Sequence, residues 1–194
     1  NQIKQINVDD LLGRDTISIE NPIVKREVAN KVVLVTGAAG SIGSEISRQL
    51  STYNLALLIL VDQAESPLYD LQQELLQNGE NNFKAIVADV RDFERMDAIF
   101  AKYKPQKVFH AAAYKHVPLM EKSPYEAVKI NVAGTKNIAD LSLKYKAERF
   151  VMVSTDKAVN PTNVMGATKR VAELYVGCLS SEKSDTKFTI TRFG

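Results

Sequence analysis

The strongest constraint on the fold is a glycine-rich loop at residues 36–43 (TGAAGSIG), which lies between an aliphatic run at 32–35 and an amphipathic stretch. A glycine motif is informative in this strand-to-helix context because the helix N-terminus then offers N–H groups and positive dipole to a pyrophosphate. Gly37 permits the tight turn, Gly40 lets the backbone approach the ligand, and Gly43 lets the helix pack closely. The loop predicts a dinucleotide site, whose further contacts include Ala39, Ser41 and Ile42.

From residue 31 onward, short aliphatic or β-branched runs alternate with amphipathic stretches, the pattern of a parallel sheet with crossover helices. Strands are predicted at 31–36, 55–62, 83–88, 107–112, 149–154 and 187–193. Helices are predicted near 41–53, 66–78, 92–103, 123–146 and 164–181. Right-handed crossovers then give an α/β fold, a Rossmann-type doubly wound parallel sheet with helices on both faces. Ligands bind such a sheet beyond the carboxyl ends of its strands.

Two helices carry start signals. Ser66 and Ser123 each precede a proline, which predicts a serine N-cap followed by proline at the first helical position. Glu126, three residues after Ser123, completes a predicted capping box.

The chain divides at residue 30. Residues 1–30 lack lasting periodicity, and the pair Asn21-Pro22 disfavours helix there, so we expect a lead-in segment. Residues 31–194 form one predicted NAD-binding Rossmann domain. Because the chain begins at Asn1 without a methionine, we expect it to be an excised fragment.

Composition narrows the function classes. The 25 Lys and Arg residues nearly cancel the 23 Asp and Glu residues and are scattered, which disfavours nucleic-acid binding. A single cysteine, Cys178, allows no internal disulfide and no thiolate metal cluster, and it suits the reducing cytoplasm. We expect no metal site. The longest apolar run, 55–61, is far shorter than the ~20 residues that cross a bilayer.

Polar residues at the ends of predicted strands suggest the remaining cofactor contacts. Asp62 ends the second strand, where a carboxylate can accept both ribose hydroxyls but would repel a 2′-phosphate, so NAD is preferred over NADP. Asp89 and Val90 end the third strand, where Asp89 either reaches the adenine edge or caps the next helix. Ala111 and Ala112 end the fourth strand, beside the predicted nicotinamide path.

The glycine spacing G-x-x-G-x-x-G resembles that of the extended short-chain dehydrogenase/reductases, over residues 31–194. The segments 110–118 (HAAAYKHVP), 131–135 (NVAGT) and 153–157 (VSTDK) together resemble the nucleotide-sugar 4,6-dehydratases. Residues 8–30 resemble the segment that joins a membrane region to the catalytic domain in the large, membrane-anchored bacterial members. Those members make precursors for surface polysaccharides and protein glycans.

This resemblance implies a reaction. NAD oxidises the sugar at carbon 4, water leaves across carbons 5 and 6, and the same hydride returns to carbon 6. Asp156 then serves as the acid, which requires a pKa raised by burial. Lys157 serves as the base, which requires a pKa lowered by burial or nearby cations.

The resemblance also implies an unusual first step. Dehydrogenases of this kind place a tyrosine four residues before a lysine, and the matching pair here is Met165 and Lys169. Methionine cannot ionise, so the carbon-4 proton leaves through Asp156, Lys157, or a water held by Thr155 and Lys169. Lys169 keeps its role of holding the ribose.

Other polar residues follow the fourth strand. Lys115 is the preferred contact to cofactor or substrate phosphate, ahead of Tyr114 and His116, and His110 is expected to pack in the core. Asn131, a poor helix former inside a predicted helix, indicates a backbone, water or substrate contact, or else an exposed helix position.

The leading interpretation is the NAD-binding part of a dehydratase that converts UDP-N-acetylglucosamine to a 4-keto-6-deoxy sugar nucleotide. The alternatives are a nucleotide-sugar 4-epimerase and a non-catalytic dinucleotide sensor. We expect the carboxyl-terminal substrate region to be absent and the fragment alone to be inactive. The full-length protein is expected to be a membrane-anchored homo-oligomer with a cytoplasmic catalytic domain.

Overall fold

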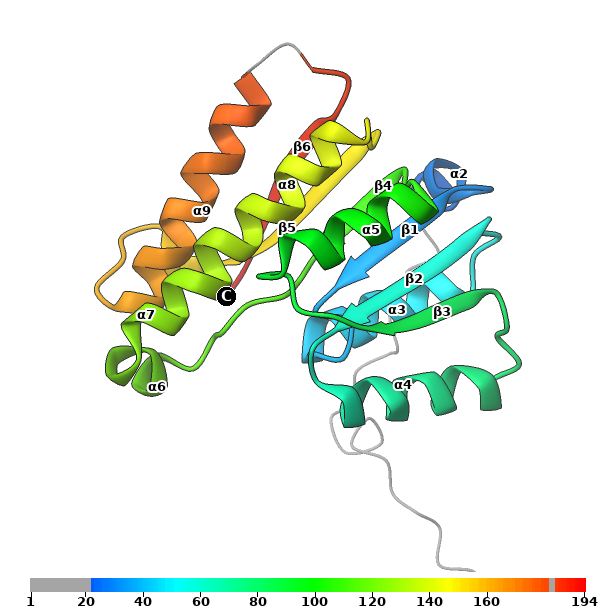
Figure 1. Cartoon of the computed structure of the whole chain (residues 1–194), viewed down its shortest axis with the longest axis horizontal. Coiled ribbons are helices and arrows are strands. Elements are labelled where there is room, and N and C mark those ends of the chain that lie inside the picture. Colours follow the sequence, from blue (N-terminus) through cyan, green and yellow to red (C-terminus); the bar gives the residue numbers. More distant parts are fainter. Residues whose placement is uncertain (1–21, 182–183) are drawn as a thin grey trace, which may run out of the picture.

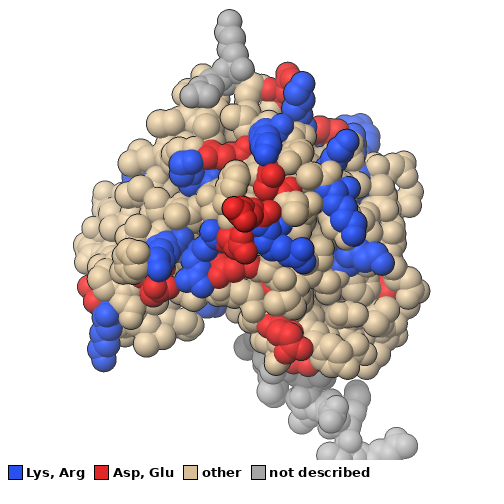
Figure 2. All heavy atoms as spheres, in the orientation of Figure 1, with Lys and Arg blue, Asp and Glu red and all other residues tan. Residues whose placement is uncertain are grey.

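The computed structural model describes residues 22–181 and 184–194. Most of the expected lead-in segment, and most of the 8–30 resemblance, therefore lie outside the described residues. Within the described part, no helix is long and apolar enough to cross a membrane. On the face drawn in Figure 2, basic and acidic side chains are interspersed rather than separated by sign.

The centre of the molecule is a six-stranded sheet in the order β3-β2-β1-β4-β5-β6, with every neighbouring pair parallel (Figure 1). The strands are β1 Val32–Thr36, β2 Leu57–Asp62, β3 Phe83–Val87, β4 Lys107–His110, β5 Arg149–Thr155 and β6 Lys187–Phe193. This strand order reverses beside β1, which creates the crevice between β1 and β4 where doubly wound folds bind ligands. The predicted fold class is confirmed.

Helices cover both faces of the sheet. They are α2 Pro22–Val28, α3 Ser41–Ser51, α4 Glu65–Gln77, α5 Phe93–Tyr103, α6 Val117–Lys122, α7 Pro124–Ala127, α8 Thr135–Lys144 and α9 Val164–Ser181, with a π-helix η1 at Val128–Gly134 and a 3₁₀ turn η2 at Asp156–Ala158. Side chains of successive strand residues point to opposite faces. Leu34 accordingly packs with α5, α8 and α9, whereas Val33 and Val35 pack with α2, α3 and α4.

Two predictions about helix starts are wrong. Asn21-Pro22 does not prevent helix, since Pro22 is the first residue of α2, where its missing N–H has no intrahelical partner to lose. Ser66 does not cap α4, which begins earlier at Glu65, after the carboxylate of Asp62 has accepted the Ala64 N–H.

The predicted single helix over 123–146 is also wrong. The chain instead forms α7, η1 and α8, preceded by the unpredicted α6. Ser123 makes no side-chain cap, so the capping box does not form, and Glu126 binds Arg91 instead. Pro124 does occupy the start of α7 as predicted. The π-helix places one extra residue in the turn, and such bulges are common at functional sites.

Candidate functional site

The glycine loop has no room for side chains at two of its three glycines. Gly37 has a φ of 69°, and a Cβ there would lie 2.4 Å from the Ala112 nitrogen. A Cβ at Gly43 would lie 1.9 Å from the Gly37 oxygen. Gly40 differs, because its Cβ would meet only the Gly37 oxygen, at 3.3 Å. Gly37 and Gly43 therefore shape the loop, while Gly40 leaves open space in front of α3.

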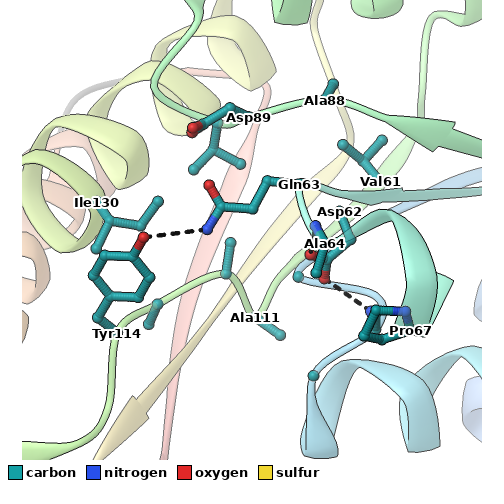
Figure 3. Close-up of a pocket in the computed structure, with 16 residues that line it drawn as sticks. Val61, Asp62, Gln63, Ala64, Pro67, Ala88, Asp89, Ala111, Tyr114 and Ile130 are labelled. Carbon is teal, nitrogen blue, oxygen red and sulfur yellow. Dashed lines mark hydrogen bonds between the residues drawn. The ribbon is translucent and has the colours of Figure 1, made fainter.

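Two adjoining cavities lie at the carboxyl edge of the sheet. The first, of about 200 Å³ and shown in Figure 3, runs from the glycine loop past the ends of β2 and β3. The second, of about 660 Å³, runs from the N-terminus of α3 to the ends of β5 and β6. They share Gly40, Ala111, Ala113 and Tyr114, so together they form one groove across the β1–β4 crevice.

The residues predicted to bind a dinucleotide all line this groove. The first cavity contains Gly37, Ala39, Gly40, Asp62, Asp89, Val90, Ala111 and Ala112. The second contains Gly40, Ser41, Ile42, Gly43, Ala111 and Lys169. Thus the groove can accommodate the two halves of an extended dinucleotide in adjoining spaces.

The Asp62 carboxylate holds the glycine loop while facing the first cavity. One oxygen accepts the Ala39 N–H at 2.9 Å and the other accepts the Ala64 N–H at 2.9 Å. Each carboxylate oxygen has a further lone pair, so both can still accept from ribose hydroxyls.

Asp89 faces the first cavity and is fixed by Arg91. Its carboxylate accepts from the Arg91 backbone N–H at 2.8 Å and from the guanidinium at 2.6 and 2.8 Å. Burial acts to raise the pKa of Asp89, but the hydrogen bonds and charge of Arg91 outweigh it and hold that pKa below its usual value. The alternative that Asp89 caps a helix is wrong, since Asp92 caps α5 through the Arg95 N–H.

Gln63 and Tyr114 approach each other across the first cavity, as Figure 3 shows. The Gln63 amide donates to the Tyr114 hydroxyl at 3.4 Å. In the second cavity, the Lys115 ammonium donates to the Ser41 hydroxyl at 3.2 Å, above the N-terminus of α3. An ammonium and a helix N-terminus facing the same space make that space favourable for a phosphate.

Lys169 lies in the wall of the second cavity and is almost fully buried. Its ammonium donates to the Val153 carbonyl at 2.8 Å, which leaves two N–H donors for other partners. Burial lowers the pKa of Lys169 to about 8, against the opposing charge of Glu173. Met165, at the tyrosine position, also lines this cavity and packs with Met120 and Ala127.

The Thr155–Lys157 segment meets the expectations only in part. Thr155 and Lys157 line the second cavity, but Asp156 does not. The Thr155 hydroxyl and the Lys157 ammonium donate to the Asp156 carboxylate at 2.9 and 3.2 Å, and these bonds lower its pKa. The prediction that burial raises the pKa of Asp156 is therefore wrong, because the carboxylate is exposed. Expected burial of Lys157 is also absent, its side chain being 51% exposed.

Asn131 has a positioning role. It is fully buried in η1, and its amide oxygen accepts the Tyr114 N–H at 2.9 Å. Its amide nitrogen donates to the Tyr114 carbonyl at 3.1 Å and to the Thr168 hydroxyl at 3.0 Å. The predicted backbone contact is therefore present, whereas the exposed position is wrong. The expected substrate contact is not found either, because the Asn131 side chain lines neither cavity. Its hydrogen bonds instead hold the 111–116 loop against α9.

Replacing Asn131 with alanine should lower the free energy of unfolding by ~1–3 kcal/mol, because three hydrogen bonds are lost and buried polar groups lose their partners. Urea unfolding followed by circular dichroism measures this. Asn81→Ala, at an exposed asparagine bonded only to the Gly79 carbonyl, is the matched control and should change stability little. Equal effects of the two substitutions would remove Asn131 from this role.

His110 is a core residue, as expected. It is completely buried, with Nδ1 2.7 Å from the Thr36 hydroxyl and Nε2 2.9 Å from the Thr135 hydroxyl. Burial, aided by the charge of Lys169, lowers its pKa to about 3. The ring is therefore neutral at physiological pH and ties β1, β4 and α8 together.

Two residues near the site were not predicted from the sequence. A Cβ at Gly166 would lie 2.4 Å from the Lys157 carbonyl, so this glycine lets α9 approach η2. Glu173 is buried in α9 despite its charge. Its signal in the sequence is a carboxylate four residues after Lys169, on the same helix face, among apolar positions.

Comparison with known proteins gives a consistent set of relatives. The chain is 47% identical to the capsular polysaccharide biosynthesis protein CapD of Staphylococcus aureus, over all of this chain and 33% of that protein. It is 33% identical to a UDP-N-acetylglucosamine 4,6-dehydratase (inverting) of Campylobacter jejuni, over 84% of this chain and 48% of that protein. It is 34% identical to a UDP-glucose 4-epimerase of Rickettsia rickettsii, over 85% and 49% respectively. The chain thus spans a third to a half of these relatives.

The resemblance to the extended short-chain dehydrogenase/reductases is confirmed by these relatives and by the fold. The model of one protein family, described as polysaccharide biosynthesis protein, matches residues 33–194. That match includes β1 from its second residue, the other five strands, both cavities and every residue discussed at the site. The chain therefore belongs to the polysaccharide biosynthesis protein family.

Proposed function

We propose that this chain is the NAD-binding part of a nucleotide-sugar 4,6-dehydratase that acts on UDP-N-acetylglucosamine. The observation that carries the proposal is the second cavity, which is lined by Thr155, Lys157 and Lys169 and by Met165, at the position where related dehydrogenases have tyrosine. The test is mass spectrometry of the products that the full-length protein forms from UDP-N-acetylglucosamine. A product lighter by one water supports the proposal, and unchanged mass contradicts it.

The residues present fit a dinucleotide. The glycine loop gives its backbone and the N-terminus of α3 to the pyrophosphate, Asp62 and Lys169 bind the two riboses, and Asp89 faces the adenine. NAD, when bound, supplies the reversible oxidation at carbon 4. The surrounding residues orient the cofactor and exclude water.

Protons are moved by the residues at the end of β5. Lys157 removes the carbon-5 proton, and Asp156 protonates the departing hydroxyl. Asp156 must then turn toward the cavity and lose its bonds to Thr155 and Lys157, because these bonds keep it ionised. We propose that the substrate covers this segment, together with the further residues of a protein as long as its relatives. This cover would remove water from both Asp156 and Lys157.

The preference for NAD over NADP is supported by the charges around the first cavity. Asp62 would repel a 2′-phosphate. The Arg91 guanidinium, which could otherwise attract that phosphate, is bound to the carboxylates of Asp89 and Glu126.

Replacing Asp62 with alanine should weaken NAD binding by roughly 1–3 kcal/mol, because two charge-assisted hydrogen bonds to ribose are lost. Titration calorimetry with NAD measures the effect. The matched control is Glu65→Ala, at a carboxylate that starts α4 but lines neither cavity. Unchanged NAD affinity in the Asp62 variant would exclude this residue from the site. Asp62→Ala also removes the hydrogen bonds to Ala39 and Ala64. Thermal unfolding of both variants therefore checks that the weaker NAD binding does not come from a loss of stability.

A 4-epimerase is the second candidate. It is favoured because the chain is as similar in sequence to the Rickettsia epimerase, at 34% identity, as to the Campylobacter dehydratase, at 33%. An epimerase shares the oxidation at carbon 4 but has no elimination step and no need for the Lys157 base. A non-catalytic dinucleotide sensor, suggested by the loss of tyrosine at position 165, would bind NAD without turnover. The mass-spectrometric test separates the dehydratase from the other two, because an epimer has the mass of the substrate and a sensor forms no product. Chromatographic separation of the nucleotide sugars then distinguishes an epimerase, which forms the carbon-4 epimer, from a sensor, which leaves the substrate unchanged. We also propose, from the resemblance, a membrane-anchored homo-oligomer whose catalytic domain lies in the cytoplasm.

A further inference from the structure

Among the residues that the structure describes, the proposed mechanism leaves one buried carboxylate without a role. Glu173 is 3% exposed and lies four residues after Lys169 in α9, on the same face of the helix. Arg192 of β6 donates to its two oxygens at 2.8 and 2.7 Å, and Arg170 donates at 3.3 Å. Hydrogen bonds from Arg192 are the main reason that the pKa of Glu173 falls to about 2, against the opposing effect of burial. Glu173 is therefore ionised at every physiological pH.

Lys169 needs a nearby negative charge. It is only 4% exposed, and burial of an ammonium strongly favours the neutral amine. The Val153 carbonyl provides one hydrogen bond but no net charge. A lysine that has lost its proton would also lose one donor and its attraction for an anionic cofactor.

The neighbouring ionisable groups do not supply that charge. His110 of β4 is neutral, with a pKa of about 3. Lys115 and Lys157 line the same cavity with positive charge, and the exposed Asp156 is already bound by Lys157. Arg192 and Arg170 are positive but engaged with Glu173. Among these described groups, Glu173 alone opposes the effect of burial on Lys169.

We propose that Glu173 supports the cofactor site through its charge: its carboxylate, fixed by Arg192 and Arg170 and buried four residues after Lys169 in α9, keeps the buried Lys169 ammonium charged, so that it can donate to the ribose. The part of this statement that concerns the ribose rests on the proposed function. The charge coupling between the two side chains does not, and it can be measured without any ligand.

The experiment is an NMR titration of Lys169 in the chain with isotope-labelled lysine, in which the Lys169 signal is identified by its loss in Lys169→Arg. In wild type we expect a pKa near 8. In Glu173→Gln, which keeps the shape but removes the charge, the pKa should fall by about one pH unit or more, a tenfold smaller ratio of ammonium to amine. An unchanged pKa in this variant would overturn the proposal.

Two further variants separate charge from packing. Glu173→Asp keeps the charge, so the pKa of Lys169 should remain closer to that of wild type than in Glu173→Gln, even where stability falls. Arg192→Gln removes a positive charge and keeps the carboxylate, so the pKa of Lys169 should rise or stay constant. If Glu173→Gln alone does not fold, the double variant Glu173→Gln/Arg192→Gln decides, because it leaves no Arg192 charge without its carboxylate partner. The pKa of Lys169 in the double variant should lie below that in Arg192→Gln, and equal values would overturn the proposal.

Cofactor binding provides the separate readout. NAD affinity of wild type should decline as the pH rises through about 8, and in Glu173→Gln the decline should begin at lower pH. Failure of wild type to bind NAD would count against the proposed function and leave the NMR result intact. Normal binding with identical pH profiles in both proteins would count against Glu173 alone.

Discussion

Replacing Gly40 with valine is expected to abolish NAD binding while leaving the fold intact. Gly40 has a φ of −72° and a ψ of 166°, an extended conformation that valine adopts without strain. Its Cβ would meet only the Gly37 oxygen. Because Gly40 lines both cavities, the added side chain would fill the space through which a pyrophosphate must pass. We expect affinity to fall more than ~100-fold, which is about 3 kcal/mol.

Calorimetric titration with NAD measures this loss, and circular dichroism with thermal unfolding verifies the fold. Gly177→Val is the matched control, because a Cβ at Gly177 meets nothing within 4 Å and that residue lines neither cavity. It should bind NAD as wild type does. A folded Gly40→Val protein that retains NAD affinity would show that the pyrophosphate does not cross this loop. Gly43→Ala would be a poor test, since its Cβ would lie 1.9 Å from a backbone oxygen and disturb the loop itself.

The sheet and the cofactor groove were predictable from the sequence because they depend on short-range patterns. Aliphatic runs mark buried parallel strands, and the carboxyl ends of such strands share one edge. Asp62 and Asp89 were therefore placed at that edge by their position alone, and both line the first cavity. The glycine loop needed only its strand-to-helix context.

Features that depend on distant partners were not predictable. Ser123 could cap a helix by its type, but Glu126 binds Arg91, which comes from another part of the chain. For Asn131 the sequence left open a backbone or water contact, a substrate contact and an exposed position. Only the fold selects the backbone contact, with Tyr114, and adds Thr168 as a partner. The π-helix that carries it, Val128–Gly134, was not predicted from the sequence.

The chemistry at the end of β5 shows the same division. The sequence places residues 155–157 after a strand, beside the cofactor, and Thr155 and Lys157 do line the cavity. It does not determine side-chain direction in the 3₁₀ turn that follows, where Asp156 binds Thr155 and Lys157 instead of facing the cavity. The protonation states of Asp156 and Lys157 therefore depend on what covers residues 155–157 in the full-length protein.

Lys157 gives the second large expected effect. In the full-length protein, Lys157→Ala should bind nucleotide sugar normally but lose turnover by ~10²-fold or more, the usual scale for a positioned general base. The reason is the order of the steps in the proposed mechanism, in which the lysine acts only after oxidation at carbon 4 has acidified the carbon-5 proton. Loss of the base blocks elimination without blocking oxidation. Lys122→Ala, at a lysine ending α6 that lines neither cavity, is the control and should turn over normally.

Two measurements locate the blocked step. Stopped-flow absorbance should show reduced cofactor accumulating on the Lys157→Ala enzyme, since oxidation continues and the hydride has no acceptor at carbon 6. Deuterium placed at carbon 5 should fail to exchange with solvent, because that exchange requires the base and not completed turnover.

A control for charge is Lys157→Arg, which keeps the positive charge but has no accessible neutral form to accept a proton, so it should fail in the same way. Near-normal turnover or normal carbon-5 exchange in Lys157→Ala would make Lys157 a bystander. The base at carbon 5 would then be another residue. The 4-epimerase would be supported instead by the absence of carbon-5 exchange in wild type, because that reaction needs the carbon-4 oxidation and no base at carbon 5.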